Sequence, residues 1–475
     1  MAISLTGGFP VSAMTPVPSR PGLSMFFRGV RTIGASFSRA AFLTMIRVLL
    51  TGLLSLMLIS SELFAQNPPS SNALEGQRID QIVISGLNRV RESTVLKQMK
   101  SQVGGLYSAA SVATDNERLD RMGLFSGIDI DSGPGANGAI INVNLRETSP
   151  YFPYPAISVT DEQGLTIGAG LKSTNFLGSG ANVSIAARGG GAAEFEVLVA
   201  SPWRPQGSWW WKTDYFLKDR FNSLDDFQEV SNELELQAGY QLTNRLRIGG
   251  RFHYISVRSD RPGITLSPSN IDRTPGVGAV MEFDSRNSWT NPKNGWWNSV
   301  DVLANGLGAD GNYWTTNVDV RRYHNIAGRH GTAFFSLLTM QTGVVGTGIP
   351  IHEDFHIGGT NSLRGWDIDA RHGKNQWLNT LEYRFDLLKV KDYSARGFNY
   401  YFGVQLAAFA DAGTAWNAKD EFNRNFIGGG GFGIRLIVPY VNVIRIDFGY
   451  GQAHQGTILH FGIMEKAVYE RRRVR

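Results

Sequence analysis

The chain has 475 residues, of which 42% are hydrophobic, and it holds 55 glycines, 11 tryptophans and no cysteine. The absence of cysteine excludes disulfide frameworks and thiolate metal sites, and it fits an exported protein that is stable without crosslinks. Residues 1–65 carry five of the 46 basic residues and one of the 41 acidic residues, so the remainder is nearly neutral and has no separate basic domain for nucleic acid.

The first 65 residues have the pattern of a leader. From Met45 onward there is one basic residue, Arg47, then an apolar run from Val48 to Ile59 and a cleavage position at Ala65. This is the pattern of a secretory signal peptide and is too short for a membrane anchor, so we expect Met45 to be the true start. The alternative is an organellar transit peptide, because the 44 residues before Met45 contain arginines and no acidic residue.

A linker at residues 66–77 precedes a small domain, which we place at residues 78–149. Alternating and helical patterns follow one another there, separated by turn residues. The expected elements are a strand at Arg78–Ser85, helices at Arg91–Lys100 and Ala110–Met122, and strands at Phe125–Ile130 and Ala139–Leu145. The order β-α-α-β-β predicts a small α+β domain.

Residues 150–464 contain segments of alternating apolar and polar residues, such as Arg245–Val257 and Asn442–Tyr450. In the second of these, Arg445 and Asp447 are interleaved with apolar residues. No helical period persists and the leader holds the only apolar run of about 20 residues, so transmembrane helices are not expected. The alternation fits a soluble sandwich, with its apolar face in a core, or an outer-membrane barrel, with its apolar face in lipid.

The tryptophans favour the barrel. All 11 lie in this half, and several are near expected strand ends, where an interfacial aromatic girdle would lie: Trp203, Trp209, Trp210, Trp211, Trp296, Trp297 and Trp416. The predicted fold is therefore mainly β, an antiparallel transmembrane barrel of about sixteen strands preceded by the small α+β domain. The last strand is expected at Gly456–Ile463, followed by a solvated basic tail at residues 465–475.

The stretch Ile357–Arg371, which reads IGGTNSLRGWDIDAR, is the most informative segment and is called the Arg364 loop below. It combines a glycine pair, Gly358 and Gly359, with a single arginine between Leu363 and Gly365. A guanidinium inside a folded protein needs a carboxylate partner, and bidentate pairing is its best geometry. The alternative is a solvated arginine on an extracellular loop tip.

Other motifs argue against catalysis. The run Gly428–Gly431 lacks the Lys-Ser/Thr of a phosphate loop, so we expect it to allow a bend or a close backbone contact. His352, His356 and His372 lack helical metal-ligand spacing, and we expect strand alternation to separate them. The sequence shows no Ser/His/acid arrangement typical of a hydrolase. We therefore expect that the protein is not an enzyme and has no cofactor and no metal site. The segment Asp284–Gly295 is expected to be a strand end and an extended turn.

Four segments together resemble the superfamily of outer-membrane protein assembly factors that includes BamA, TamA and the two-partner secretion transporters, also known as the bacterial surface antigen family. They are MEFDSRNSWTNPKNGWW, IGGTNSLRGW, FADAGTAW and GGGGFGIRLIVP. The small domain resembles a POTRA domain. In this family the loop after the eleventh barrel strand folds back into the barrel.

The resemblance implies roles for particular residues. The tetrad Leu363, Arg364, Gly365 and Trp366 matches the family's Arg-Gly-aromatic loop tip, and Phe409 and Asp411 match its Phe-x-Asp motif on the lumen wall. The resemblance thus implies that Arg364 pairs with Asp411, and Glu382 is a second acidic candidate. The loop would then be a latch inserted into the lumen.

For function, the resemblance implies a factor that assembles or inserts outer-membrane β-barrels: the POTRA-like domain receives unfolded clients and the barrel inserts them. The alternatives are a secretion pore for a dedicated partner protein and a passive porin-like barrel. The expected partners are unfolded clients, the lipid bilayer and accessory assembly proteins, without nucleic acid. We expect the protein to lie in the bacterial outer membrane, with the POTRA-like domain in the periplasm. The alternative location is an organellar outer envelope. Because the sequence has room for one POTRA-like domain, we expect an accessory or lineage-specific role.

Overall fold

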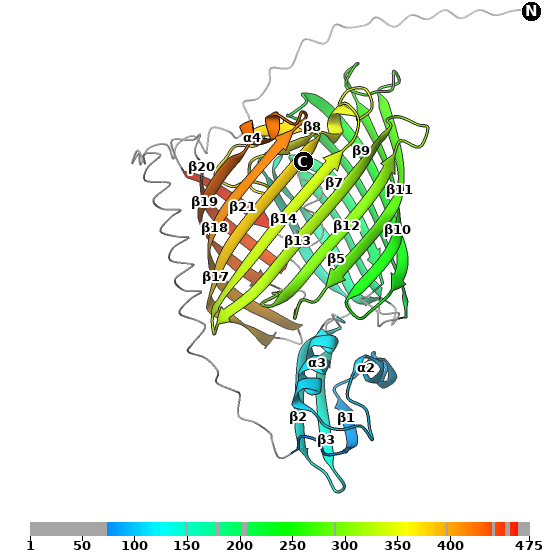
Figure 1. Cartoon of the computed structure of the whole chain (residues 1–475), viewed down its shortest axis with the longest axis vertical. Helices are drawn as coiled ribbons and strands as arrows, with labels where there is room; N and C mark the ends of the chain where they lie inside the picture. The colour runs from blue at the N-terminus through cyan, green and yellow to red at the C-terminus, as the bar shows by residue number, and fades with distance from the viewer. Residues whose placement is uncertain are drawn as a thin grey trace, which may run out of the picture.

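The computed structural model describes residues 74–463 except 121, 123, 148–150, 177–180, 202–206, 289–290, 396–397, 439–441 and 452–456. The leader with Ala65, the residue Trp203 and the basic tail at 465–475 lie outside the described residues. The described chain forms a small domain at one end of a large barrel (Figure 1). Within this part of the chain, no helix has both the length and the hydropathy to cross a bilayer.

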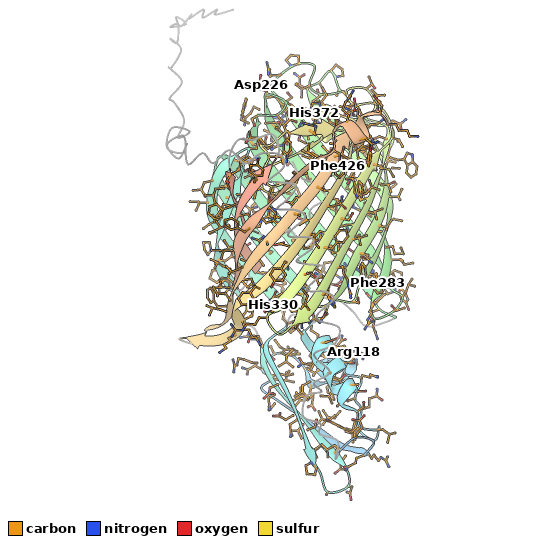
Figure 2. All side chains as sticks on the ribbon, turned by 60° about the vertical axis from the view of Figure 1, so that its left-hand side comes forward. Arg118, Asp226, Phe283, His330, His372 and Phe426 are labelled. Atoms are coloured by element: carbon orange, nitrogen blue, oxygen red, sulfur yellow. The ribbon has the colours of Figure 1, made fainter. Side chains whose placement is uncertain are left out.

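The two rims of the barrel differ in their distance from the small domain. Figure 2 shows Arg118 of the small domain beyond the rim at which His330 and Phe283 lie, whereas Asp226 and His372 lie at the opposite rim. We call these the near rim and the far rim. The connection that contains the Arg364 loop belongs to the far rim.

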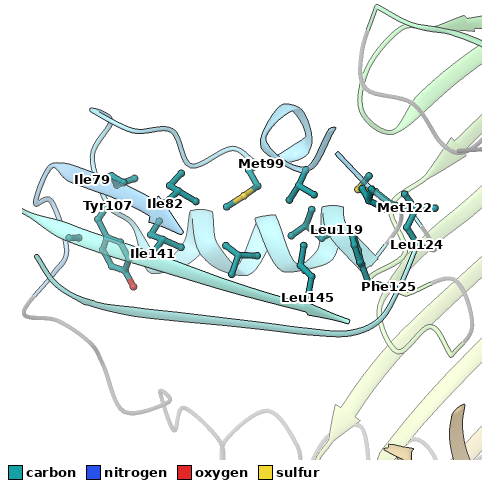
Figure 3. Close-up of a cluster of buried hydrophobic side chains, with 14 of the residues drawn as sticks. Ile79, Ile82, Met99, Tyr107, Leu119, Met122, Leu124, Phe125, Ile141 and Leu145 are labelled. Carbon is teal, nitrogen blue, oxygen red and sulfur yellow. The ribbon is translucent and has the colours of Figure 1, made fainter. Parts of the chain in front are cut away.

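The small domain has the predicted order of elements, β-α-α-β-β, which confirms this part of the fold class. Its elements are β1 (Ile79–Ser85), α2 (Glu92–Gln98), α3 (Ala109–Asp120), β2 (Phe125–Pro134) and β3 (Ala139–Glu147). β3 is the central strand, parallel to β1 and antiparallel to β2. Because strand residues alternate between faces, Ile141 and Val143 of β3 share one core with Val95 of α2 and Leu119 of α3 (Figure 3).

Glu147, at the end of β3, fastens the loop between β1 and α2. Its carboxylate accepts hydrogen bonds from the backbone N–H groups of Asn88, Arg89 and Val90 at 2.8, 2.9 and 2.8 Å. Partial burial alone would raise the pKa of this carboxyl, but the hydrogen bonds from these three N–H groups and the charge of Arg89 hold the pKa below its ordinary value. The ionised side chain therefore stabilises the entry to α2.

The large domain is a 16-stranded antiparallel sheet curled into a barrel, so the predicted barrel is confirmed. Its first eleven strands are β4 (Phe152–Thr160), β5 (Gly164–Phe176), β6 (Ala181–Gly190), β7 (Ala192–Ala200), β8 (Trp209–Asn222), β9 (Phe227–Gln241), β10 (Leu246–Ser259), β11 (Ile271–Asp284), β12 (Gly295–Asn305), β13 (Tyr313–Ala327) and β14 (His330–Gln341). The last five are β17 (Asn375–Ala395), β18 (Phe398–Trp416), β19 (Ile427–Val438), β20 (Asn442–Gly451) and β21 (Thr457–Ile463).

The connections between barrel strands are unequal in length. A near-rim turn joins β11 to β12 at the predicted strand end, Asp284, and α4 (Glu421–Arg424) lies between β18 and β19. The longest connection joins β14 to β17, which pair with each other in the wall. It contains a short helix, η2 (Ile351–Glu353), and a two-stranded hairpin made of β15 (Phe355–Ile357) and β16 (Arg371–Gly373).

Side chains alternate between a polar lumen and an apolar outer surface. Arg251, Glu282 and Asp301 are on inward positions and are buried, whereas the outward positions include Ile248 and Met281, which are 41% and 47% exposed. A soluble sandwich would place apolar side chains in its core and charged ones outside. The observed arrangement is that of a barrel with its apolar face toward lipid, and it excludes the sandwich.

The expected aromatic girdle is only partly correct. Trp209, Trp211 and Trp296 face outward and are 73%, 41% and 40% exposed, as a girdle requires. Trp210 and Trp297 are buried instead, because neighbouring residues of a strand point to opposite faces. Their rings lie in the lumen against the guanidinium groups of Arg247 and Arg321, at 4.3 and 4.5 Å from ring centre to Cζ.

Replacing Glu147 with alanine should remove the shared acceptor of three N–H groups and destabilise the small domain by on the order of 1 kcal/mol, since part of the site is open to water. Because the folded pKa is depressed, this stabilisation is present above the unfolded pKa of about 4.3 and is lost as the pH falls through the lower folded pKa. Urea unfolding of the isolated small domain at several pH values measures both effects. Asp131→Asn, at an exposed position of β2, is the control, and a Glu147→Ala domain as stable as wild type at pH 7 would contradict this role.

Candidate functional site

The Arg364 loop folds back into the barrel from the far rim. The hairpin of β15 and β16 forms its base, and the tip residues Leu363, Arg364 and Trp366 are only 0%, 2% and 6% exposed. The two apolar tip residues join a cluster with residues of four wall strands, which are Leu337, Leu378, Ala415 and Ile427. The solvated loop tip considered as an alternative is therefore wrong, because the loop fills part of the lumen.

Glycines let the loop make its tight turn. Gly358, Gly359 and Gly365 have φ values of 129°, 80° and 88°, a region that residues with a Cβ rarely adopt. The Ser362 hydroxyl accepts a hydrogen bond from the Gly358 N–H at 2.8 Å and donates to the Gly358 carbonyl at 2.6 Å. The Gly359 N–H donates to the Trp366 carbonyl at 2.8 Å, which closes the turn.

Arg364 meets the carboxylate that the resemblance implied. Its Nε and Nη2 donate to the two oxygens of Asp411 on β18 at 2.7 and 2.8 Å, in the bidentate geometry that suits a guanidinium. The backbone N–H of Arg364 also donates to Asp411, at 3.1 Å. On the same strand, the ring of Phe409 lies under the guanidinium, with Cζ 3.4 Å from the ring centre.

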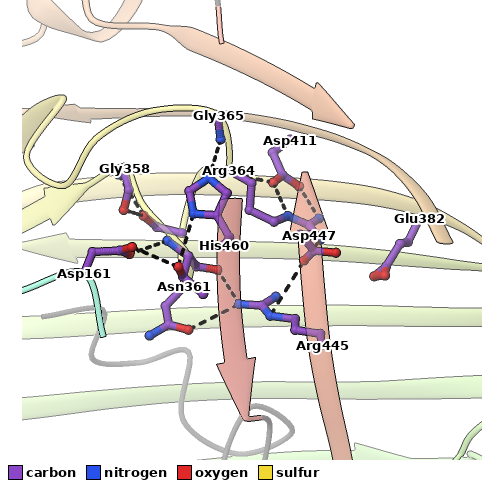
Figure 4. A network of polar contacts seen from close by, with 12 residues as sticks. Asp161, Gly358, Asn361, Arg364, Gly365, Glu382, Asp411, Arg445, Asp447 and His460 are labelled. Atoms are coloured by element: carbon purple, nitrogen blue, oxygen red, sulfur yellow. Dashed lines mark hydrogen bonds and ion pairs between the residues drawn. The ribbon is translucent and has the colours of Figure 1, made fainter. Parts of the chain in front are cut away.

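A second carboxylate, Asp447 of β20, completes the site and was not predicted as a partner. Nη1 of Arg364 donates to Asp447 at 3.0 Å (Figure 4). Asp447 also contacts Arg435 of β19, and Arg445 lies 3.9 Å away. The signal in the sequence was its position in the alternating segment Asn442–Tyr450, which places it on the polar face.

Glu382 of β17 belongs to the same network but does not bind Arg364 directly among the described contacts. Its carboxylate accepts hydrogen bonds from Arg435 at 2.6 and 3.0 Å and from Arg384 at 3.3 Å. Arg435 contacts Asp447 as well, so Glu382 is linked to Arg364 through one arginine and one aspartate. Burial of this many charges is tolerable only because each has a partner of opposite sign.

The wall beside the loop is built from glycines. A Cβ at Gly429 of β19 would lie 2.1 Å from the carbonyl oxygen of Arg364, and one at Gly451 of β20 would lie 2.3 Å from that of Gly365. A Cβ at Gly449 would lie 2.6 Å from the Gly365 nitrogen. The run Gly428–Gly431 thus contributes the close backbone contact that was one of its two predicted roles.

The loop also spans the seam of the barrel. The sheet order begins at β21 and ends at β4, and these two edge strands lie side by side, yet no backbone ladder joins them within the described residues. Thr360 links the two sides. Its N–H and hydroxyl donate to Asp161, in the turn after β4, at 2.6 and 3.0 Å, and its hydroxyl oxygen lies 3.1 Å from Nδ1 of His460 on β21.

His460 adds a second contact to the loop, and its partners set its tautomer. The Gly365 N–H donates to Nε2 of His460 at 2.9 Å, so this nitrogen carries no proton. The proton is then on Nδ1, which donates to the Thr360 hydroxyl, and that hydroxyl donates to Asp161. Asp161, Thr360 and His460 therefore form one directed chain of hydrogen bonds across the seam, which we call the seam clasp.

The structure corrects one expectation about the histidines. Strand alternation does not separate His356 and His372, because they lie on opposite strands of the hairpin and face each other as register partners. Alternation keeps neighbours along one strand apart, but it brings directly opposite residues of two strands together.

Removing Arg364 should leave Asp411 without its guanidinium. We expect Arg364→Ala to lower the free energy of unfolding by about 3 to 5 kcal/mol in a dry lumen and by less where water enters, with Arg364→Lys intermediate. The double variant Arg364→Ala with Asp411→Ala should cost less than the sum of the single variants, by about 1 kcal/mol or more. Urea unfolding in liposomes, followed by tryptophan fluorescence, measures these differences.

The matched control for this cycle is the pair Arg261 and Asp226, whose side chains are 51% and 71% exposed. Water screens such a pair, so its coupling energy should be near zero. Equal coupling in both cycles, or additive effects at Arg364 and Asp411, would count against a dry, paired site in the lumen.

Two family models match the chain. The Omp85 superfamily domain matches residues 175–464, which is more than half of the chain. The surface antigen variable number repeat, a POTRA model, matches residues 77–148. These matches cover the barrel from the end of its second strand, β5, onward and the whole small domain.

Two curated relatives are outer membrane protein assembly factors BamA. The one from Nitratidesulfovibrio vulgaris is 21% identical over an alignment of 369 residues, with 73% of this chain and 45% of that protein covered. The one from Neisseria meningitidis serogroup B is 22% identical over 409 residues, with 74% and 48% covered. The chain thus spans about half the length of the curated relatives it matches.

Two solved structures have a similar fold. BamA from Haemophilus ducreyi lacking POTRA domains 1–3 has a TM-score of 0.52 at 15% identity, covering 81% of this chain and 83% of that one. CdiB from Acinetobacter baumannii has a TM-score of 0.51 at 12% identity, with 81% and 73% covered. At these identities the likeness shows the fold alone. With the family matches and the observed architecture, the chain belongs to the Omp85 superfamily and is a β-barrel membrane protein with a POTRA domain.

Proposed function

We propose that this protein is an outer-membrane factor that accepts unfolded β-barrel proteins and assists their insertion into the bilayer, without enzymatic chemistry or a cofactor. The observation that supports the proposal best is the seam. Its two edge strands, β4 and β21, are adjacent, and the hydrogen bonds of the seam clasp link the two sides, whereas no backbone ladder joins these strands among the described residues. A barrel closed in this way has one place where it can open.

An opened seam has the chemistry to receive a client strand. Edge strands carry rows of unpaired N–H and C=O groups, and in lipid each unpaired group costs several kcal/mol. An incoming strand that pairs with such an edge satisfies these groups through its backbone, so many different client sequences fit. The free energy for insertion then comes from client folding and from burial of the client's apolar side chains in lipid.

The side-chain chemistry of the seam clasp suits repeated opening. Three hydrogen bonds between side chains and the loop, each worth about 0.5 to 3 kcal/mol, are easier to break than a continuous ladder. The Arg364 loop keeps its ion pairs with β18 and β20 when the clasp breaks, because these strands lie on one side of the seam. In this proposal the loop is a latch that stays in the lumen.

The small domain supplies the capture step. Its sheet has β1 and β2 as edge strands, and β2 is 10 residues long. We propose that unfolded clients add a strand to this edge in the periplasm before they reach the barrel. The barrel would lie in the bacterial outer membrane, with an organellar outer envelope as the alternative, and accessory assembly proteins would complete the set of partners.

A secretion pore for a dedicated partner is the second candidate. It is favoured by the placement of the Arg364 loop, which fills part of the lumen and would act there as a plug held by side chains. A passive porin-like barrel fits less well, because such a barrel needs an open lumen and this one holds a buried loop tip.

Insertion of an unfolded β-barrel client into liposomes tests the proposal. The chain has no cysteine, so one engineered pair across β4 and β21 forms the only disulfide and locks the seam. The matched control is a pair at Ile248 and Met281, outward-facing register partners within the continuous β10–β11 ladder. We expect the wild type and the oxidised control to speed client folding, and the oxidised seam variant to lose this effect until reductant is added.

Three outcomes would distinguish an insertion factor that uses the seam from a secretion pore. Client insertion no faster than in empty liposomes would sink the insertion proposal. Equal rates for the locked and reduced seam would show that the clients do not use it. Ion conductance that rises in an Arg364→Ala variant, with no effect on client insertion, would favour the secretion pore. A variant that lacks residues 78–148 tests the capture step separately.

A further inference from the structure

Three side chains with metal-ligating atoms converge at the base of the Arg364 loop. His356 of β15 and His372 of β16 are register partners in the hairpin, with ring centres 5.6 Å apart. Oδ1 of Asp369 lies 2.8 Å from Nδ1 of His356 and 3.3 Å from Nδ1 of His372. One donor atom from each of the three residues lies within 4.8 Å of the others, close enough to share one ion.

The backbone holds this arrangement in place. The ladder between β15 and β16 places the two imidazoles on one face of the hairpin. Asp369 has a φ of 64°, a left-handed conformation that non-glycine residues adopt rarely, and this turns its carboxylate toward both rings. Such a backbone conformation costs free energy, which the contacts of the Asp369 side chain offset.

A fourth group points to a ligand that carries positive charge. Asp354 follows directly after η2, two residues before His356, and the charges of His356, His372 and Asp225 act on its carboxylate. Its Oδ1 is enclosed and accepts no hydrogen bond from any described residue. An enclosed carboxylate oxygen without a donor is costly, and a cation held by the neighbouring histidines would lower that cost.

We propose that His356, His372 and Asp369 bind a zinc-type divalent cation. Two imidazoles and one carboxylate form a donor set that Zn²⁺ accepts, and it is too rich in nitrogen for Ca²⁺ or Mg²⁺. Water would take the remaining position, since the side chains of His372 and Asp369 are 58% and 38% exposed. His356, at 10%, is the anchored ligand.

The position of the site gives the ion a structural effect. His356 and His372 flank the Arg364 loop on its two sides, so one ion bound to both pins the loop at its base. Figure 2 shows His372 at the far rim, away from the small domain, so the ion reaches the site from the solvent on that side. This inference does not depend on the proposed function, because it concerns the loop in the resting barrel.

Zinc titration of the full chain, purified without a histidine tag and stripped with chelator, tests the proposal. Calorimetry should give one Zn²⁺ per chain, and Co²⁺ should show the visible absorption of a low-coordinate nitrogen and oxygen site. We expect His356→Ala or His372→Ala to weaken binding at least about 10-fold, and the double variant to abolish saturable binding. Asp369→Asn, which keeps the size of the side chain, should weaken it as well.

Thermal unfolding supplies an independent readout. Zn²⁺ should raise the midpoint of the wild type reversibly, with chelator restoring the original value, and should leave the double variant unchanged. His324→Ala, an exposed histidine of β13 outside the group, should bind and respond as wild type does. Heat-modifiable migration shows that each variant is folded. Weak binding only at millimolar Zn²⁺, or binding unchanged in the double variant, would overturn the proposal.

Discussion

The pairing of Arg364 with Asp411 is the interaction on which the rest of the lumen depends. A guanidinium enclosed in a barrel is costly unless a carboxylate meets it in good geometry, and Asp411 does so with both oxygens. This pairing also determines where the Arg364 loop lies in the barrel. Once Arg364 is fixed on β18, the loop must pass along β19 and β20, and its tip must lie beside the seam.

The neighbouring wall is shaped to accept that path. Gly429, Gly449 and Gly451 leave room for the loop backbone where any side chain would collide with it. Asp447 supplies a second negative charge between Arg364 and Arg435, and Arg435 also pairs with Glu382, so the ion pairs extend from β17 to β20. Thr360 and His460 then join the loop to the last strand, and Asp161 joins it to the turn after the first. A single buried pair is thereby connected to the part of the barrel that has no ladder.

Most of the fold could be predicted from the sequence, because its signals are periodic. The alternation in Asn442–Tyr450 placed Asp447 on the polar face, and the change from alternating to helical patterns located α3. Partners far apart in the chain are different, since periodicity does not show which strands face each other across a lumen. Asp411, 47 residues after Arg364, was found through a family resemblance, while Asp447 and His460 were missed.

Other errors came from applying a correct rule to the wrong pair of residues. Trp210 and Trp297 were assigned to a girdle from their positions near strand ends, although alternation sends every second residue into the lumen. The same rule predicts that His356 and His372 are separated, although they are direct register partners in the hairpin. For the tryptophans, the question is which face of the strand points to the lumen, and for the histidines it is the register of the hairpin. A single sequence gives neither directly.

Hydrogen exchange of the barrel in lipid shows directly whether the Arg364 loop holds the seam shut. Thr360→Val removes the hydroxyl that joins Asp161 to His460 and keeps the shape of the side chain. We expect faster backbone exchange in β4 and β21 of this variant, with exchange in β10 and β11 unchanged. Exchange in β4 and β21 equal to that of the wild type would contradict it.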